Sequence, residues 1–526
     1  MNKVRSGWFI VPIMLLMSAC APANGHIELP QQYRLPQAPL AATFERRSGR
    51  IALLDDSGNL VIMDQTGGNM VKITTDADAA TAQSQSVSTR PTETTYRYPV
   101  WSPDTSQIAF VEVNAQRTST SRVIELGADS VTVQRGAQSV TIQQSASGST
   151  ARSAPNTSSV ANQPSRVIIE NSSGGAIIAS TLYLARTDGK APLQELVNSN
   201  GGALGYLDWS PDGSQLAFLS QVQSGVTGLN VIAPSAGKPR EILTGAAAAW
   251  NWRPDSKALL ARVDTSTGGG DTSNLAVWDA QTDKPAAPFA QNVSLPFDAP
   301  AYSPDGNAML ITVNSDGRNV LALADRQGNV TRELAPIVGH ISYVWSPVGA
   351  SVAYIDTAAS ADSGVSADGS NVLQASTGGT LHVLDVNTGV DRVMTAQPVT
   401  SFFWSPDGQR LAVFSPVQVN EMSSKFPGMD LTGAQPNSVL ILQIIDAGTR
   451  QARQLFYLEP TDEFSVLLDQ FDHFSHSATL WSPDSDHLVL SIIDASQQPS
   501  IIETEASGSI EPRTLSKGTL AVWSPR

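Results

Sequence analysis

Short apolar stretches alternate with tight polar turns along most of the chain, and one unit recurs. In LGYLDWSPDGSQLAFLS (204–220), an alternating stretch ends on Trp209, SPDG follows, and a second apolar stretch begins. Ser, Pro, Asp and Gly in this order are typical of a type I turn. The unit is therefore predicted to be a β-hairpin with Trp209 as an apolar anchor beside its turn.

Two further strands follow each hairpin. After 204–220 come GLNVIAP (228–234) and REILT (240–244), and other units close the third strand with Asp and a turn, as in LHVLDVNTG (381–389). Four short antiparallel strands repeated every 40-odd residues indicate a β-propeller blade. Eight copies of the motif are present, and their anchoring aromatic residues are Trp101, Trp209, Trp252, Tyr302, Trp345, Trp404, Trp481 and Trp523. We therefore predict an all-β fold, a single β-propeller of eight four-stranded blades.

The two ends of the repeat array complement each other. TLAVWSPR (519–526) is a first strand without a second, whereas residues 50–74 supply strands two to four without a first. Pairing the N- and C-terminal strands in one blade would close the ring and remove two exposed sheet edges. A seven-bladed ring would require one degenerate unit, at Trp345 or Trp252, to form no blade.

The repeats resemble the WSPDG-type propeller repeats of the periplasmic protein TolB and of the propeller domain in prolyl oligopeptidase-family enzymes. The resemblance covers residues 44–526. It implies the fold and is nearly silent on function, since one fold can host many activities.

The charge composition excludes two classes of binding partner. The 526 residues include 15% charged residues and carry a net charge of −15, without a basic run. Nucleic acid and anionic membrane surfaces require clustered Lys and Arg, so neither is an expected partner.

The N-terminal segment resembles a bacterial lipoprotein signal. Lys3 and Arg5 precede a short apolar core (8–17), and small residues lead to Cys20, the sole cysteine. This pattern predicts a signal peptide over 1–19, lipid on Cys20 and a flexible tether over 20–43. The chain would then be held at the cell membrane by lipid alone, on its extracytoplasmic side. The alternative is an ordinary secretory signal with an incidental cysteine.

Long insertions are predicted to lie on one face of the ring. They fall between second and third strands or between blades, and long loops on a rigid scaffold commonly carry binding functions. A polar low-complexity insertion spans about 114–180. Its part 114–165 is expected to be disordered or a loose polar arm, and residues 123–144 could form a hairpin. Residues 420–433 suggest an adhesive tip with Met422, Phe426 and Met429.

The segment YLEPTDEFSVLLDQFDHFSHSATLW (457–481) concentrates the unusual chemistry of the chain. Asp469, Asp472, His473 and His476 lie within eight residues. Such a mixture could bind a metal or act as acid and base, and WSPDG-type propellers include lyases that use His and a bound metal. The preferred interpretation is structural, because Phe471 and Phe474 interleave the polar residues and could be buried. No metal or cofactor is expected.

The sequence contains no nucleophile elbow, P-loop, dinucleotide fingerprint or hydrolase domain. The first hypothesis is therefore a non-enzymatic, TolB-like scaffold of the bacterial envelope, a monomeric propeller that binds an envelope or secreted protein, or a polymer. The candidate binding face comprises Met422, Phe426, Met429, Asp469, Asp472, His473 and His476. The alternative is a propeller hydrolase or lyase that acts on extracellular or envelope polysaccharide.

Overall fold

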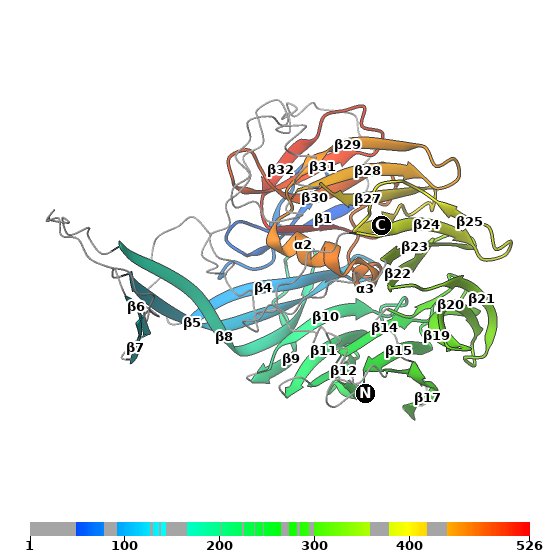
Figure 1. Cartoon of the computed structure of the whole chain (residues 1–526), viewed down its shortest axis with the longest axis horizontal. Helices are drawn as coiled ribbons and strands as arrows, with labels where there is room; N and C mark the ends of the chain where they lie inside the picture. Colours follow the sequence, from blue (N-terminus) through cyan, green and yellow to red (C-terminus); the bar gives the residue numbers. More distant parts are fainter. Residues whose placement is uncertain are drawn as a thin grey trace, which may run out of the picture.

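Eight antiparallel sheets are arranged around a common axis, so the predicted eight-bladed propeller is confirmed (Figure 1). The computed structural model describes residues 49–77, 92–126, 130–135, 138–143, 166–200, 202–223, 226–235, 237–245, 247–264, 273–280, 284–293, 299–357, 378–417 and 439–526. Cys20, the predicted tether and the loop with Met422, Phe426 and Met429 lie outside these residues. No helix among the described residues is long and apolar enough to span a membrane.

Blade 1 closes the ring. Its strands, from the axis outward, are β33 (Leu520–Trp523), β1 (Arg50–Leu54), β2 (Leu60–Asp64) and β3 (Val71–Lys72). Strand β33 pairs antiparallel with β1, so that Trp523 lies opposite Ile51. The Ser524 N–H also donates to the Arg50 carbonyl at 2.7 Å. The predicted pairing of the two ends of the array is confirmed.

Blade 2 carries a long extension. It contains β4 (Thr92–Trp101), β5 (Gln107–Leu126), β8 (Arg166–Arg186) and β9 (Gln194–Asn200). Strands β5 and β8 remain paired to Leu126 and Arg166, and a hairpin of β6 (Ser130–Arg135) and β7 (Gln138–Gln143) follows β5. The described part of the insertion therefore contains regular strands that project from the ring, where the sequence suggested a loose arm with at most one hairpin (Figure 1).

The next three blades follow the regular order of four strands from the axis outward. Blade 3 contains β10 (Leu204–Trp209), β11 (Leu216–Gln223), β12 (Val226–Ile232) and β13 (Arg240–Gly245). Blade 4 contains β14 (Ala247–Trp252), β15 (Ala258–Asp264), β16 (Ser273–Asp279) and β17 (Lys284–Val293). Blade 5 contains β18 (Ala301–Tyr302), β19 (Ala308–Ser315), β20 (Arg318–Asp325) and β21 (Val330–Pro336).

The last three blades complete the ring. Blade 6 contains β22 (His340–Trp345), β23 (Ser351–Thr357), β24 (Thr380–Asp385) and β25 (Asp391–Val393). Blade 7 contains β26 (Ser401–Trp404), β27 (Arg410–Pro416), β28 (Leu440–Asp446) and β29 (Ala452–Leu458). Blade 8 contains β30 (His487–Ile493), β31 (Pro499–Glu505) and β32 (Arg513–Lys517), and its innermost strand is reduced to a bridge between Trp481 and Leu488.

The repeated Ser-Pro-Asp-Gly turn has the predicted form and a recurring hydrogen-bond pattern. In blade 3, the Gly213 N–H donates to the Ser210 carbonyl, and the Ser210 hydroxyl donates to Asp212 at 2.7 Å. The same hydroxyl accepts the Gln215 N–H at 2.9 Å. Gly213 has a φ of 71°, a left-handed conformation that glycine adopts without steric cost. Local chemistry thus specifies each hairpin.

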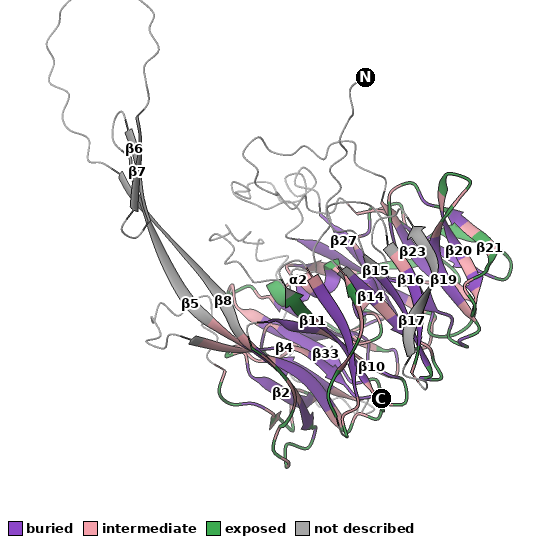
Figure 2. Ribbon diagram, turned by 90° about the horizontal axis from the view of Figure 1, so that it is seen from below, coloured by how far each residue is buried: buried purple, intermediate pink, exposed green. Residues whose placement is uncertain are grey.

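The anchoring Trp residues join neighbouring blades. The Trp209 indole N–H donates to the Val100 carbonyl of blade 2 at 3.3 Å, and the Trp481 indole donates to the Phe403 carbonyl of blade 7 at 3.0 Å. Trp523 is fully buried in blade 1. Buried residues are concentrated in the inner strands, whereas most residues of an outer strand such as β21 are exposed or half-buried (Figure 2). The core is therefore a series of interfaces between blades.

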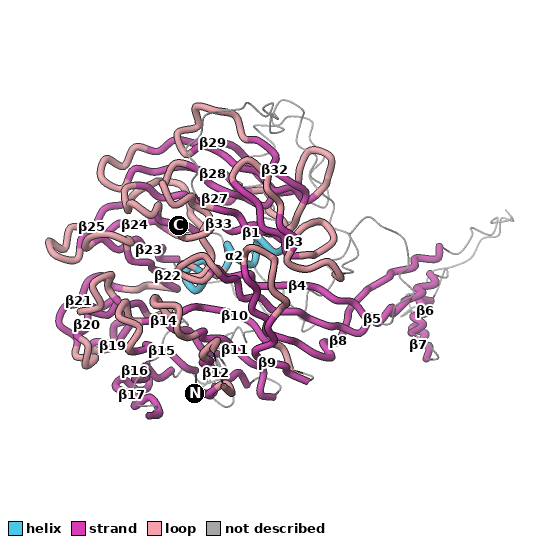
Figure 3. The backbone as a smooth tube through the Cα atoms, turned by 180° about the vertical axis from the view of Figure 1, so that it is seen from behind, coloured by secondary structure: helices cyan, strands magenta, loops and turns pink. Residues whose placement is uncertain are grey.

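Long connections reach one face of the ring. Strand β23 ends at Thr357 before β24 begins at Thr380, and β27 ends at Pro416 before β28 begins at Leu440. Because antiparallel strands alternate in direction, second-to-third connections and blade-to-blade connections share a face. The first-to-second turns lie at the other ends of the strands. Viewed from the other side of the ring, α2 and α3 lie near the axis (Figure 3).

Candidate functional site on the ring axis

Two short helices lie near the axis of the ring, in the connection between blades 7 and 8 (Figure 1). They are α2 (Asp462–Asp469) and α3 (Phe471–Phe474). We call residues 461–478 the axial segment. No helix was predicted over these residues, so the two helices are an addition to the all-β prediction.

The sequence does contain the signals for α2. Thr461 is the N-cap, and its hydroxyl accepts the Phe464 N–H at 3.3 Å. Asp462 and Glu463 occupy the first turn, where carboxylates favour the positive end of the helix dipole. Buried residues then recur at helical spacing, at Phe464, Leu467 and Leu468. The surrounding strand repeats concealed this pattern.

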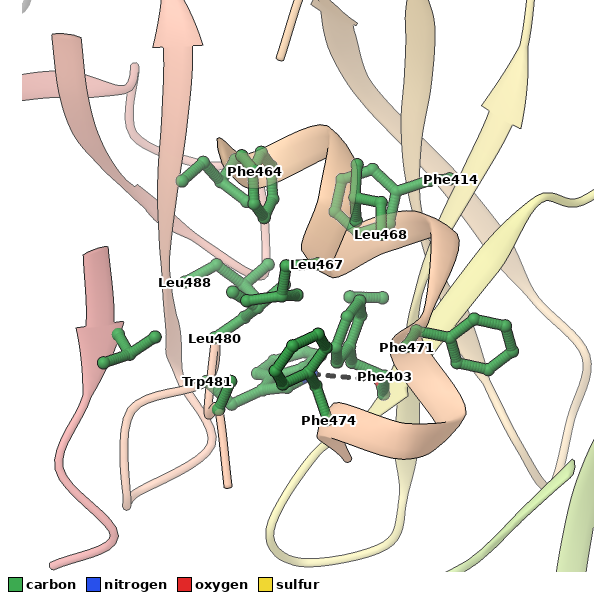
Figure 4. Packing of buried hydrophobic residues seen from close by; sticks show 14 of the residues in the cluster. Phe403, Phe414, Phe464, Leu467, Leu468, Phe471, Phe474, Leu480, Trp481 and Leu488 are labelled. Carbon is green, nitrogen blue, oxygen red and sulfur yellow. Dashed lines mark hydrogen bonds between the residues drawn. The ribbon is translucent and has the colours of Figure 1, made fainter. Parts of the chain in front are cut away.

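Aromatic side chains fix the axial segment to blades 7 and 8. Phe464 packs edge-on against Phe414 with ring centroids 5.9 Å apart, and Phe471 lies 4.7 Å from Phe402. Figure 4 shows Phe464, Phe471 and Phe474 on the two helices, and the hydrogen bond from the Trp481 indole to the Phe403 carbonyl. Phe471 and Phe474 are both buried, as the interleaved pattern predicted.

Phe474 extends this contact to blades 2 and 3. Its ring stacks on Tyr206 with a centroid distance of 4.5 Å and an interplanar angle of 13°. It also stacks more loosely on Tyr98, at 6.5 Å. The Tyr206 hydroxyl additionally bonds the Gln470 side chain, and the His473 ring meets Tyr206 edge-on at 5.7 Å. The axial segment therefore bridges blades 7 and 8 to the far side of the axis.

Tyr98 and Tyr206 share an unusual backbone. Each lies three residues before the anchoring Trp of its blade, and they have φ values of 55° and 53°. Both strands show a register shift here, between Arg97 and Val100 and between Gly205 and Asp208. A bulge of this kind redirects a side chain, and left-handed conformations at bulky residues are costly and concentrate at functional sites. Sequence reasoning missed both tyrosines.

The four predicted polar residues of the axial segment have different environments. Asp469 and His476 are exposed, His473 is half-buried and Asp472 is buried. The Asp472 carboxylate accepts the His473 N–H at 3.0 Å. Within the described parts of the chain, no group of three or more His, Cys, Asp or Glu side chains is placed to hold a metal ion.

The surrounding protein partly desolvates the exposed polar residues. Desolvation raises the pKa of Asp469 to about 6, raises the pKa of Glu463 and lowers the pKa of His476. Their side chains are nevertheless reached by water. Both conditions hold when a group is open to solvent on one side and surrounded by protein on the others. This arrangement suits ligand binding near the axis.

Another acidic group, Asp208, lies on β10 beside Trp209. It is half-buried, and desolvation raises its pKa to about 7, an effect that the nearby Trp250 indole partly opposes. Desolvation also raises the pKa values of Tyr98 and Tyr206. Perturbed titratable groups cluster at functional sites. The axial site thus joins groups of blades 2, 3 and 4 to the axial segment.

One histidine outside this site has an acidic partner that the sequence did not reveal. His382 of β24 lies 3.0 Å from the Asp391 carboxylate of β25, and its ring stacks on Tyr354 at 4.6 Å. The Tyr354 hydroxyl donates to the same carboxylate at 2.6 Å. The sequence suggested that His382 has no acidic neighbour, because nine residues separate it from Asp391. The β24–β25 hairpin brings them together, on the outer strands and away from the axis.

Comparisons with known proteins give only weak likenesses to solved structures. No protein-family model and no curated protein matches the sequence. Similar solved structures include TolB from Acinetobacter baumannii, with 14% identity, coverage of 66% of this chain and 79% of that chain, and a TM-score of 0.33. An oligogalacturonate lyase in complex with manganese has 14% identity, coverage of 60% and 78%, and a TM-score of 0.39.

A prolyl endopeptidase structure is also similar, with 11% identity and a TM-score of 0.42. The match covers 77% of this chain and half of that chain. At these identities and TM-scores the likenesses decide neither the fold nor the function. Function must therefore be argued from the site.

Proposed function

We propose that this chain is a non-enzymatic binding scaffold of the bacterial cell envelope. The ring docks an envelope or secreted protein, or a polymer, on the face that carries its long connections. Lipid on Cys20 holds it on the extracytoplasmic side of the membrane. The likeness of the repeats to those of TolB supports both an envelope location and a binding role.

One observation carries this proposal. The axial segment lies near the ring axis and is fixed there by aromatic packing, with Phe471 on Phe402 and Phe474 on Tyr206. A propeller enzyme would be expected to direct acids and histidines from several blades at this position. Here the segment buries its aromatic side chains against the ring and presents the exposed polar side chains of Asp469 and His476, which suits recognition. The long connections at the same ends of the strands enlarge the surface available for docking.

Partner capture tests the proposal directly. The tethered protein should be solubilised with detergent and used as bait, and partners identified by mass spectrometry. Exchanging Met422, Phe426 and Met429 for Ser should weaken capture and leave the melting temperature unchanged, because flexible apolar side chains suit an adaptable contact surface. Deleting residues 145–165 is the matched control and should leave capture intact. Equal capture by all three proteins would contradict the proposed docking surface.

The anchor is tested separately. Cys20→Ser should move the protein from the membrane fraction to the soluble fraction after a high-salt wash, because the only thiol is lost. Bacterial lipoproteins carry several acyl chains, which together hold a protein stably at a membrane. A variant that still pellets with membranes would show that the lipid on Cys20 is not the anchor.

The alternative is an enzyme that acts on extracellular or envelope polysaccharide. The partly desolvated carboxyl group of Asp469 favours it. Desolvation raises its pKa to about 6, and such a group can donate a proton near neutral pH. The variant with His473→Ala and His476→Ala decides between the two functions. A scaffold should lose stability at most, whereas an enzyme should fold normally and lose cleavage of envelope polymer.

A further inference from the structure

Three side chains of two neighbouring blades form a corner beside the axial segment. Tyr206 and Asp208 belong to β10, and Trp250 belongs to β14. The rings of Tyr206 and Trp250 have centroids 6.3 Å apart and are inclined at 68°. All three residues are half-buried, so part of each remains open to solvent.

The position of Tyr206 is fixed rather than adaptable. Its backbone has a φ of 53° at a register shift of β10, and this irregularity changes the direction of its side chain from that in a regular strand. One ring face is covered by Phe474, and the hydroxyl bonds the Gln470 side chain. Trp250 and His473 meet the Tyr206 ring edge-on, at 6.3 Å and 5.7 Å. A strained residue held in place by several contacts is a mark of a preorganised site.

Asp208 supplies a carboxyl group without a counter-charge. Among the described residues, no Lys, Arg or His side chain forms an ion pair with it, and no positive group counteracts its desolvation. The buried Trp250 indole N–H lies near this carboxyl but forms no hydrogen bond of good geometry within the described structure. A carboxylate in such surroundings gains most from an incoming positive charge.

We propose that Tyr206, Trp250 and Asp208 form a binding site for an organic cation, an ammonium or guanidinium group. Aromatic faces attract cations through the ring quadrupole, and aromatic cages with carboxylates bind quaternary ammonium groups. The net charge of −15 further concentrates cations around the ring. The cation can come from a Lys or Arg side chain of a docked protein or from a small free molecule. Only the first source rests on the proposed function.

Small probes test the site without a partner. Choline, N-acetyl-lysine amide and N-acetyl-arginine amide should be titrated into the full chain, with tryptophan fluorescence and calorimetry as readouts. The control is 3,3-dimethyl-1-butanol, which has the shape of choline without its charge. We expect at least one cation to bind and the neutral analogue to bind about tenfold more weakly or not at all. Equal binding of choline and its neutral analogue, or binding of no cation, would overturn the proposal.

Variants locate the binding. Asp208→Asn and Trp250→Leu should each weaken binding of the cation about tenfold, since they remove the charge and one ring. Asp212→Asn is the matched control, because it removes a carboxylate from the turn of the same blade, outside the proposed site, and it should bind nearly as the parent does. Far-ultraviolet circular dichroism and thermal unfolding establish that each variant folds. Unchanged binding in folded Asp208→Asn protein would show that the cation binds elsewhere.

The two proposals fail in different ways. Binding of the lysine or arginine amide assigns the site to a protein partner, and binding of choline alone assigns it to a free ammonium compound. If the ring captures a partner but binds no cation, the cation site is wrong and the scaffold function stands. If it binds the cation but captures no partner, the scaffold function fails and the site stands.

Discussion

At the scale of single residues, the repeated turn shows how one side chain organises a hairpin. In blade 7, the Ser405 hydroxyl donates to the Asp407 carboxylate and accepts the Arg410 N–H. One buried hydroxyl therefore links the turn to the start of the second strand. In blade 6, Val348 replaces the aspartate, and the Ser346 hydroxyl donates to the Val348 carbonyl instead. This valine is 50% exposed. Blade 6 therefore lacks a hydrogen bond that most of the other blades possess.

Val348→Asp should stabilise the protein. The new carboxylate can accept the Ser346 hydroxyl and a following backbone N–H, as Asp407 does in blade 7. Restoring a consensus hydrogen bond at a surface turn contributes about 0.5–1.5 kcal/mol. Chemical denaturation would measure the gain. The control Val348→Ser shortens the side chain without adding a carboxylate and should give less; an equal gain would assign the effect to removal of the exposed valine.

Asp208 should make stability depend on pH in a way opposite to the turn aspartates. Desolvation raises its folded pKa from 3.8 to about 7. Between these values the folded state binds more protons than the unfolded state, so the free energy of unfolding falls as pH rises. Asp208→Asn removes this loss. Its stability relative to the parent should therefore be about 2–3 kcal/mol more favourable at pH 8.5 than at pH 5.

A turn aspartate supplies the control for this experiment. Burial alone would raise the pKa of Asp212, but hydrogen bonds from Ser214 and Ser210 lower it below 3.8. Asp212 is thus ionised in both states above pH 5, and Asp212→Asn should destabilise the protein equally at pH 5 and pH 8.5. Thermal unfolding at the two pH values gives both differences. A pH-independent effect of Asp208→Asn would show that Asp208 titrates normally.

At the scale of elements, the sequence predicted what local chemistry decides. Ser-Pro-Asp-Gly turns and apolar alternation define the hairpins wherever they occur, so the blades and the closing pair of β1 and β33 could be predicted. Helix α2 was not predicted, although the N-cap Thr461 and apolar residues at helical spacing, Phe464, Leu467 and Leu468, indicate a helix. The prediction of strands throughout the chain hid the 3.6-residue period of this segment.

Other parts of the axial site could not have been predicted. Tyr98 and Tyr206 occupy an ordinary strand position by sequence, and only the bulges turn them toward Phe474. The corner of Tyr206 and Trp250 depends on which blades are neighbours in the closed ring. Such contacts join residues far apart in the chain, and no local pattern encodes them. The proximity of His382 and Asp391, in contrast, follows from the hairpin register and was within reach.

The axial segment should be separable from the ring in stability. Phe474→Ala removes the stack on Tyr206 and Tyr98, both half-exposed, and should mainly loosen residues 470–477. Phe110→Ala empties a fully buried position of the ring core on β5, against Tyr96, and should cost about 3–5 kcal/mol. We expect faster limited proteolysis of the segment in the first variant and a lower melting temperature in the second. Equal losses of melting temperature would mean that the segment and the ring unfold as one unit.

At the scale of the whole molecule, the ring depends on contacts between its first and last described strands. Strand β33 pairs with β1 over four residues, from Ile51 opposite Trp523 to Leu54 opposite Leu520. It also reaches blade 8, since the Trp523 N–H donates to the Thr479 carbonyl at 2.7 Å. Arg50 continues the connection to blade 2, where it donates to Thr187 at 2.7 Å and lies over the Trp101 ring. Blade 1 is thus bonded on both sides.

Removing residues 519–526 should therefore destabilise the entire ring rather than fray one blade. The deletion takes away the innermost strand of blade 1 and the buried Trp523, and loss of a buried Trp alone costs about 3–5 kcal/mol. It also exposes an edge of β1, which favours association between chains. Deleting only Pro525 and Arg526, both exposed, is the control and should leave the melting temperature unchanged. Thermal unfolding and size-exclusion chromatography test both proteins; a truncated chain that stays monomeric and melts like the control would show that blade 1 does not close the ring.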